Sequence, residues 1–94
     1  KTAMRKTIHC TISGKVQGVF FRAFTRELAR DLHLTGWVRN NSNGTVELVA
    51  QGDDEKLTKL KNKLQQGPPS ARVGSVDCEQ LDDAETYQEF KLRY

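Results

Sequence analysis

The chain has 94 residues, of which 36% are apolar and 29% charged, and 15 Lys and Arg against 12 Asp and Glu give a net charge of +3. This length allows one small domain, and no apolar run approaches the ~20 residues of a membrane span. The mild positive charge favours a small anionic ligand and falls short of a nucleic-acid-binding surface. We expect one domain over residues 4–94, with residues 1–3, ahead of Met4, a remnant of expression.

The first half of the chain predicts a strand, a helix and a hairpin. Residues 7–13 alternate between apolar and polar side chains, as in a half-buried strand, and residues 14–19 form a loop with two glycines. From Phe21 apolar residues recur every three or four positions, which predicts a helix to about His33. Residues 37–40 and 45–50 are two short strands around an Asn-Gly pair, a strong hairpin signal.

The second half of the chain predicts a helix and two further strands. Acidic residues from Asp53 onward open a helix with a stripe of leucines, and Gly67 with the two following prolines ends it. Residues 73–79 predict a strand with a bulge, because its valines break strict alternation. Residues 89–94 predict a last short strand.

This order of elements predicts an α+β fold, the ferredoxin-like split βαβ sandwich. It is βαββαβ plus a short C-terminal strand, with two helices packed on one face of a mainly antiparallel sheet. The handedness of its crossovers places the first and fourth strands side by side, and with them Cys10 and Cys78. The same architecture hosts enzymes, RNA-binding domains, metallochaperones and regulatory domains, so function must be argued from a site.

The two cysteines have neither the number nor the spacing of a disulfide scaffold or a zinc site. Cys10 lies on the apolar side of its strand, where burial makes a thiol inert, so no nucleophilic cysteine is expected. The chain carries no secretory signal, which predicts a cytoplasmic protein. Cys10 and Cys78 could be bonded or free, and because the cytoplasm is reducing we expect free buried thiols.

The loop at residues 14–19 and the helix that follows are the strongest candidate for a site. A glycine-containing turn into a helix N-terminus can point several backbone N–H groups at one anion. Arg22 lies in the first turn, where the helix dipole disfavours a cation, and its guanidinium can bind an oxyanion through two hydrogen bonds. An ordinary strand–helix connection followed by a surface Arg explains the same residues, and the pattern leaves both interpretations open.

Asn40 is a second candidate, because Asn is depleted in strands and yet ends the strand at residues 37–40. Its amide could position a water molecule by donating and accepting hydrogen bonds at once. Alternatively, Asn40 and Asn41 simply begin the hairpin turn. Neither a P-loop motif nor metal-ligand spacing is present, so no metal or cofactor is expected.

Two blocks of sequence resemble the acylphosphatase family. Residues 14–22, Gly-Lys-Val-Gln-Gly-Val-Phe-Phe-Arg, are similar to its signature G-[RK]-V-Q-G-V-x-[FY]-R. Residues 36–40, Gly-Trp-Val-Arg-Asn, followed by Gly-Thr-Val at 44–46, are similar to its second block. Weaker similarities lie at residues 69–72 and 90–94, so that the resemblance extends over almost the whole chain in the family's order.

The resemblance implies a small free-standing hydrolase that cleaves the carboxyl-phosphate anhydride of acyl phosphates to a carboxylate and inorganic phosphate, without metal or cofactor. It also implies a monomer with no nucleic-acid or membrane partner. The family's phosphate-binding Arg corresponds to Arg22 and its water-orienting Asn to Asn40. The phosphate-binding loop corresponds to the backbone of six consecutive residues: Gln17, Gly18, Val19, Phe20, Phe21 and Arg22.

The chain departs from the family pattern at two positions. Phe20 stands where the signature often has Gly, and its bulk could change loop packing or substrate access. Asn41 stands where Thr often follows the Asn, which could loosen the support of Asn40. Both departures bear on the rate rather than on the type of reaction.

Two other classes of function compete with the enzyme. The first is a non-catalytic domain that binds phosphate or carbamoyl phosphate and was excised from a larger enzyme. The second is an RNA-binding domain, which would place two or three aromatic residues on its central strands, where this chain offers only Trp37.

Overall fold

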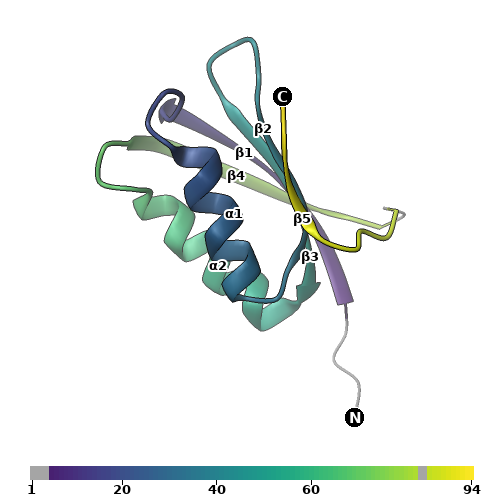
Figure 1. Ribbon diagram of the computed structural model, residues 1–94. Helices are drawn as coiled ribbons and strands as arrows, with labels where there is room; N and C mark the ends of the chain where they lie inside the picture. The colour runs from purple at the N-terminus through teal and green to yellow at the C-terminus, as the bar shows by residue number, and fades with distance from the viewer. Residues whose placement is uncertain (1–4, 83–84) are drawn as a thin grey trace.

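The computed structural model describes residues 5–82 and 85–94, so the expected remnant at residues 1–3 lies outside the described residues (Figure 1). Five strands and two helices are found in the order strand, helix, strand, strand, helix, strand, strand. They are β1 (Arg5–Lys15), α1 (Phe21–Asp31), β2 (Thr35–Asn40), β3 (Val46–Asp53), α2 (Asp54–Gln66), β4 (Arg72–Leu81) and β5 (Phe90–Arg93).

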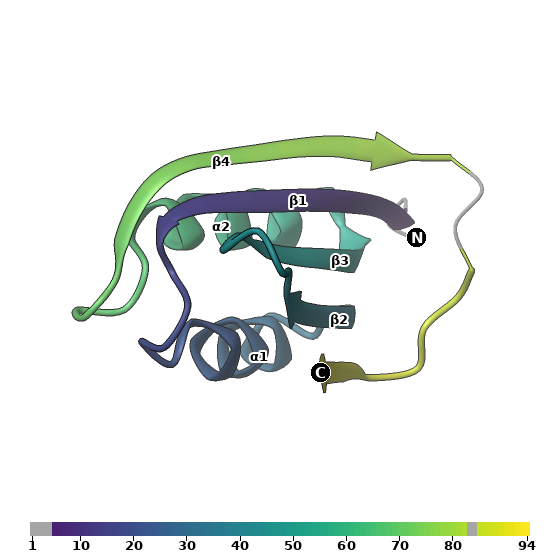
Figure 2. The same cartoon turned by 90° about the horizontal axis from the view of Figure 1, so that it is seen from above.

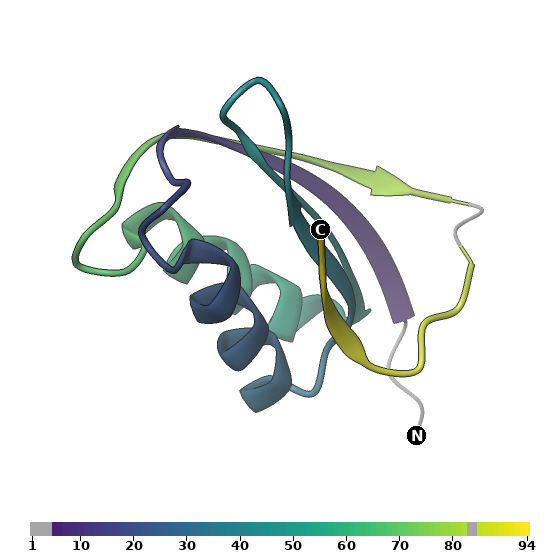
Figure 3. The same cartoon turned by 45° about the horizontal axis from the view of Figure 1, so that its top comes forward.

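The strands form one sheet in the order β4-β1-β3-β2-β5. The first three pairings are antiparallel, and only β2 with β5 is parallel. Both helices lie on the same face of the sheet, which Figure 2 shows from above and Figure 3 at an intermediate angle. This confirms the ferredoxin-like sandwich, including the neighbouring first and fourth strands. Neither described helix is long and apolar enough to cross a membrane.

Alternation along the strands explains which face the helices cover. In β1 the side chains of Ile8, Cys10 and Ile12 are buried under the helices, and the polar side chains between them point to the opposite face. The leucine stripe of α2 lies against this face and is fully buried. Burial of each such leucine stabilises the fold by about 1.5–3 kcal/mol, so the apolar pattern decides the orientation of the helix.

Helix α1 ends at Asp31, two residues before the predicted end at His33. The N–H of His33 donates to the carbonyl of Arg30 and that of Leu34 to the carbonyl of Ala29, at 3.0 and 2.8 Å. These two bonds form a Schellman motif with His33 in the left-handed conformation at φ 59°. The apolar spacing continues through Leu32, which is why periodicity alone placed the end too late.

Strand β4 is an edge strand, paired only with β1, and it contains the predicted bulge. Ser13 pairs with Ser75 and Gly14 pairs with Val73, so Gly74 is the extra residue of β4. A Cβ on Gly14 would lie 2.2 Å from the carbonyl oxygen of Arg72, so the two backbones can approach here only because this residue lacks one.

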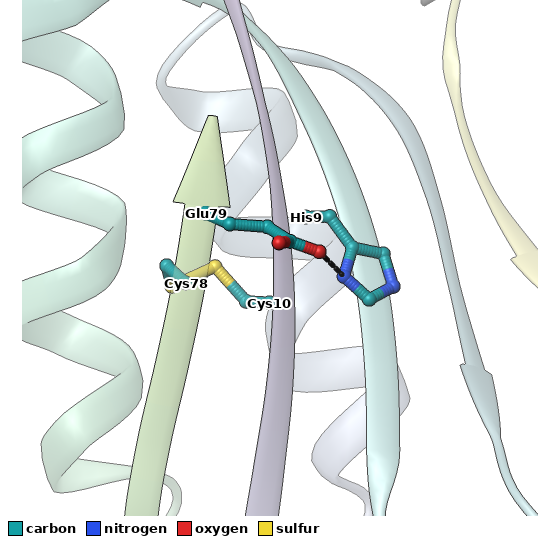
Figure 4. The surroundings of a disulfide bond; sticks show 4 residues. All are labelled: His9, Cys10, Cys78 and Glu79. Carbon is teal, nitrogen blue, oxygen red and sulfur yellow. Dashed lines mark ion pairs between the residues drawn. A yellow bond between two sulfur atoms is a disulfide. The ribbon is translucent and has the colours of Figure 1, made fainter. Parts of the chain in front are cut away.

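The expectation of free thiols is wrong, because Cys10 and Cys78 form a disulfide between β1 and β4 (Figure 4). Antiparallel pairing places the two residues directly opposite each other, with 4.1 Å between their Cα atoms. Such close pairs are within reach of a disulfide, and apolar alternation carries no information on the oxidation state. The bond also leaves neither cysteine as a thiol nucleophile.

Candidate active site

The loop from β1 to α1 curls around the N-terminus of α1. Val16 and Val19 bury their side chains in the core and anchor the loop. Between and after them Gly18 and Phe20 are exposed and adopt left-handed backbone conformations, at φ 73° and 62°. Phe20 is the N-cap of α1, a position where its side chain offers no hydrogen bond to the helix. The loop therefore leaves the end of the helix open.

The N-terminus of α1 presents backbone donors without an intrahelical acceptor. The first bond of the helix runs from the N–H of Phe24 to the carbonyl of Phe20, at 3.0 Å. The N–H groups of Phe21, Arg22 and Ala23 therefore have no acceptor within the helix. No acidic residue lies in the first turn to offset the positive end of the helix dipole. This end of the helix is suited to an anion.

The side chain of Gln17 ties this loop to the β2–β3 hairpin. Its Nε2 atom donates to the carbonyl oxygens of Asn41 and Thr45, at 2.7 and 2.9 Å. Asn41 is itself held by bonds from its N–H to the Thr45 carbonyl (2.8 Å) and from its Nδ2 to Thr45 Oγ1 (3.0 Å). Asn41 thus closes the hairpin directly after Asn40. The sequence predicted only a backbone role for Gln17 and missed this bridging role of its side chain.

Arg22 and Asn40 meet in one hollow of about 280 Å³ at the loop, although 18 positions separate them in the chain. The hollow is also lined by three other residues of the predicted loop, Gly18, Phe20 and Phe21. The side chain of Gln17 instead bonds to the β2–β3 hairpin, and that of Val19 is buried in the core. The full lining is Val16, Gly18, Phe20, Phe21, Arg22, Ala23, Asn40 and Leu92.

The C-terminal strand holds the guanidinium of Arg22. Nη1 of Arg22 donates to the backbone carbonyl of Arg93 at 3.0 Å, and the guanidinium carbon lies 4.7 Å from the centre of the Tyr94 ring. Leu92 of the same strand lines the hollow. Sequence reasoning placed a strand here but missed these contacts, because only the parallel pairing of β5 with β2 brings the strand beside α1. The similarity at residues 90–94 was the one signal that pointed to them.

Among the residues that the structure describes, Arg22 is the only ionisable side chain that lines the hollow. Backbone donors, a helix N-terminus and one guanidinium together can hold a small oxyanion, and the Asn40 amide can hold a water molecule beside it. Within residues 5–82 and 85–94, no group of three or more His, Cys, Asp or Glu side chains is arranged to hold a metal ion.

A second polar cluster lies on the opposite, uncovered face of the sheet. Glu47 accepts hydrogen bonds from His9 Nε2 at 2.6 Å and from Arg39 Nε at 3.0 Å. Arg39 also lies over the ring of Trp37, with 5.3 Å between the guanidinium carbon and the ring centre. Burial alone would raise the pKa of Glu47, but the hydrogen bonds and positive charges of His9 and Arg39 outweigh burial and lower it.

Fold and site together define a small ferredoxin-like domain with an electropositive hollow at a loop–helix junction. The family model described as Acylphosphatase matches residues 8–92. An acylphosphatase of Coxiella burnetii (strain Dugway 5J108-111) is 50% identical over 86 residues, which cover 92% of this chain and 90% of that protein. The chain belongs to the acylphosphatase family, whose members are hydrolases of acyl phosphates.

Solved structures agree with this assignment. The structure of an acylphosphatase from Coxiella burnetii has a TM-score of 0.91 and 48% identity, covering 95% of this chain and 93% of that one. Full-length HypF, in its phosphate- and nucleotide-bound form, has a TM-score of 0.92 and 25% identity; the match covers all of this chain but only 12% of HypF. The same fold thus occurs both as a small protein and as part of a much larger one.

Proposed function

We propose that this chain hydrolyses acyl phosphates with Arg22 and the backbone of residues 17–22 binding the phosphoryl group and Asn40 positioning the attacking water. The observation that carries the proposal is the single hollow lined by both side chains and entered by the open N-terminus of α1. An acyl phosphate already has a good leaving group, a carboxylate that is stable at neutral pH. Catalysis therefore needs mainly positioning and stabilisation of charge.

Arg22 and the loop amides act on the phosphoryl oxygens. In phosphoryl transfer the negative charge is spread over three equatorial oxygens, which need several donors from different directions. The guanidinium supplies positive charge, and the N–H groups of the first helical turn supply hydrogen bonds of fixed direction. The carbonyl of Arg93 and the ring of Tyr94 restrict the guanidinium before substrate arrives, which reduces the entropy lost on binding.

Asn40 acts on the water on the other side of the phosphoryl group. The amide oxygen accepts a hydrogen bond from the water, and the NH₂ group holds the phosphate or a second water. Because no described residue in the lining carries a carboxylate or an imidazole, we assign the proton of the water to a phosphate oxygen of the substrate itself. The water oxygen bonds to phosphorus as the bond from phosphorus to the carboxylate oxygen breaks.

We further propose that the reaction needs no metal or cofactor and that the protein acts as a monomeric domain over residues 4–94 in the cytoplasm, without nucleic acid. The mild positive charge, which falls short of a nucleic-acid-binding surface, supports the absence of a nucleic-acid partner. The disulfide is unusual for that compartment, where thiols are kept reduced. Alkylation of the cysteines in freshly lysed cells, before and after reduction, measures whether the bond exists there.

The test is hydrolysis of benzoyl phosphate in the presence of a chelator, with wild type beside Arg22→Lys and Asn40→Ala. Arg22→Lys keeps the charge and loses the planar set of donors, and Asn40→Ala loses the water-binding amide. Each loss of a transition-state contact is expected to lower kcat by two to three decades, or about 3 kcal/mol. An undiminished rate in either variant would remove that residue from the mechanism, and a rate abolished by the chelator would refute metal independence.

Two matched variants control for unspecific effects. Arg5→Lys makes the same substitution at the opposite end of β1, where Arg5 is exposed, and Asn62→Ala does so on the exposed side of α2. Both are expected to retain the wild-type rate, and circular dichroism checks that all four variants are folded.

The second candidate function is a non-catalytic domain that binds phosphate. The match of the whole chain to 12% of HypF supports it, because that protein carries the same fold inside a larger chain. The same assay separates the two, since a binding domain would hold inorganic phosphate at the loop and leave benzoyl phosphate intact.

A further inference from the structure

A second, open groove continues from the hollow along one face of α1. Its apolar lining comes from the loop, from successive turns of the helix and from the connection between α2 and β4: Phe20, Ala23, Phe24, Leu28 and Pro68. Figures 1 and 3 show why these segments share a surface, since the β1–α1 loop and the α2–β4 connection lie at the same end of the molecule. From Phe20 to Leu28 the helix rises about 12 Å, at 1.5 Å per residue.

The groove and the hollow adjoin each other, because Phe20 and Ala23 line both. In an acyl phosphate a single oxygen joins the phosphorus to the carbonyl carbon. A substrate whose phosphoryl group lies against Arg22 must therefore direct its acyl group out of the hollow within a few bonds. The groove on α1 is the apolar surface that begins at that point.

The ring of Phe20 is exposed to solvent where the hollow and the groove meet. It is 83% exposed, and the left-handed backbone conformation of this residue turns it out of the loop. Among the described residues only Phe20 and Tyr94 are large exposed hydrophobic side chains, and both lie near Arg22: Phe20 lines the same hollow, and the Tyr94 ring centre is 4.7 Å from the guanidinium carbon. An apolar group placed against Phe20 would remove this surface from water, which is favourable in proportion to the area covered.

Two carboxylates also line the groove, those of Glu27 and Asp31, about one and two turns beyond Ala23 on the same helix. A negative charge on the acyl group would meet the carboxylate of Asp31 and that of Glu27, which pairs with Arg26 Nε at 3.6 Å, while Arg22 in the hollow is engaged by the phosphoryl group. The lining therefore combines attraction for apolar groups with repulsion of anionic ones.

We propose that this groove binds the acyl group of the substrate, and that the substrates are acyl phosphates with an apolar alkyl or aryl group rather than those that carry a second carboxylate or phosphate. The inference rests on the proposed function and assigns specificity to the face of α1 formed by Ala23, Phe24, Glu27 and Leu28.

The experiment measures kcat/KM for acetyl, butyryl, hexanoyl, benzoyl and glutaryl phosphate. Full burial of a methylene is worth about fourfold in binding, and because the groove is open on one side we expect about twofold per added methylene. Hexanoyl phosphate, with four more methylenes, should then exceed acetyl phosphate by roughly sixteenfold, while glutaryl phosphate, with its second carboxylate, falls below butyryl phosphate.

Two variants test the groove itself. Leu28→Gln keeps the size of the side chain and is expected to flatten the dependence on chain length, measured as the ratio of kcat/KM for hexanoyl phosphate to that for acetyl phosphate. Because Leu28 is partly buried and its loss could disturb folding, Glu27→Leu is the second variant, at an exposed position. It enlarges the apolar surface and removes a charge, so hexanoyl phosphate should improve two- to threefold and glutaryl phosphate should improve as well. Glu55→Leu makes the same change at an exposed position of α2 and is the matched control.

A flat series of rates, or a preference for glutaryl over butyryl phosphate, would overturn the groove proposal alone. An increase in Glu55→Leu equal to that in Glu27→Leu would also overturn it. If no member of the series is hydrolysed, acetyl and benzoyl phosphate included, the proposed function itself fails and this inference fails with it.

Discussion

The charged side chains on the uncovered face of the sheet differ from Arg22, at the start of α1, in whether they are paired with opposite charges. On the uncovered face Glu47 lies between His9 and Arg39, and Trp37 lies against the guanidinium groups of Arg39 and Arg93. At the helix-covered end Arg22 has no carboxylate partner among the described residues and bonds only to a backbone carbonyl. The first cluster satisfies its own charges, and the second has the capacity to bind an anion.

This difference separates stability from activity. A satisfied cluster contributes through contacts that already exist in the folded protein, so changing it should alter the free energy of unfolding. An unsatisfied cluster contributes when a ligand arrives, so changing it should alter the rate. The two regions are predicted to respond to different measurements, and the following variants can break or sharpen that separation.

The largest effect on stability is expected from removal of the disulfide. Without it, the edge strand β4 keeps only its non-covalent pairing with β1 and its packing against α2. The bond closes a loop of 68 residues, and the double variant Cys10→Ala, Cys78→Ala should lose about 4 kcal/mol in urea unfolding. Wild type treated with a reductant should reproduce the loss. A fall in kcat under conditions where the variant is folded would contradict the separation of the two regions.

A smaller effect is expected from Glu47→Gln, on the order of 1–3 kcal/mol at neutral pH, with kcat unchanged. The pKa of Glu47 is lowered in the folded protein, so its stabilising contribution is present above the ordinary pKa of 4.5 and is lost as the pH falls through the lowered value. Urea unfolding between pH 7 and pH 2 should show an acid-sensitive component in wild type that is missing in Glu47→Gln.

Glu79→Gln is the matched control for this measurement. Glu79 contacts the same histidine from β4, at 3.5 Å from His9 Nδ1, but its side chain is 70% exposed (Figure 4). Solvent screens such a pair, so the loss should be well under that of Glu47→Gln. Equal losses of stability for the two variants would mean that the 2.6 Å hydrogen bond between His9 and Glu47 stabilises the fold no more than the exposed contact of Glu79.

The smallest effect is expected at the C-terminus, from Tyr94→Leu. Tyr94 is 96% exposed, so stability should hardly change. Loss of the ring beside Arg22 removes a cation–π contact worth about 0.5–1 kcal/mol at an exposed site, which corresponds to a two- to fivefold fall in kcat/KM. Tyr94→Phe keeps the ring and should restore the rate. A rate in Tyr94→Leu equal to that of wild type would show that the Arg93 carbonyl alone positions Arg22.

Much of the fold could be predicted from local patterns. Alternation in β1, the Asn-Gly hairpin and the leucine stripe of α2 each depend on a few neighbouring residues, and all three are confirmed. The end of α1 was predicted too late, because a Schellman motif centred on His33 leaves no mark on apolar periodicity. The state of the cysteines was predicted wrongly, because it depends on pairing across β1 and β4 and on redox chemistry.

The sequence by itself determined the order of the elements, the loop at the start of α1 and the two residues, Arg22 and Asn40, to which we assign the proposed reaction. Only the tertiary structure decided that they share one hollow, that Gln17 bridges the loop to the hairpin and that β5 delivers a carbonyl and a ring to Arg22. The reason is physical: propensity and periodicity act within a few residues, whereas these juxtapositions join positions 18 to 72 apart, which only the tertiary fold brings together.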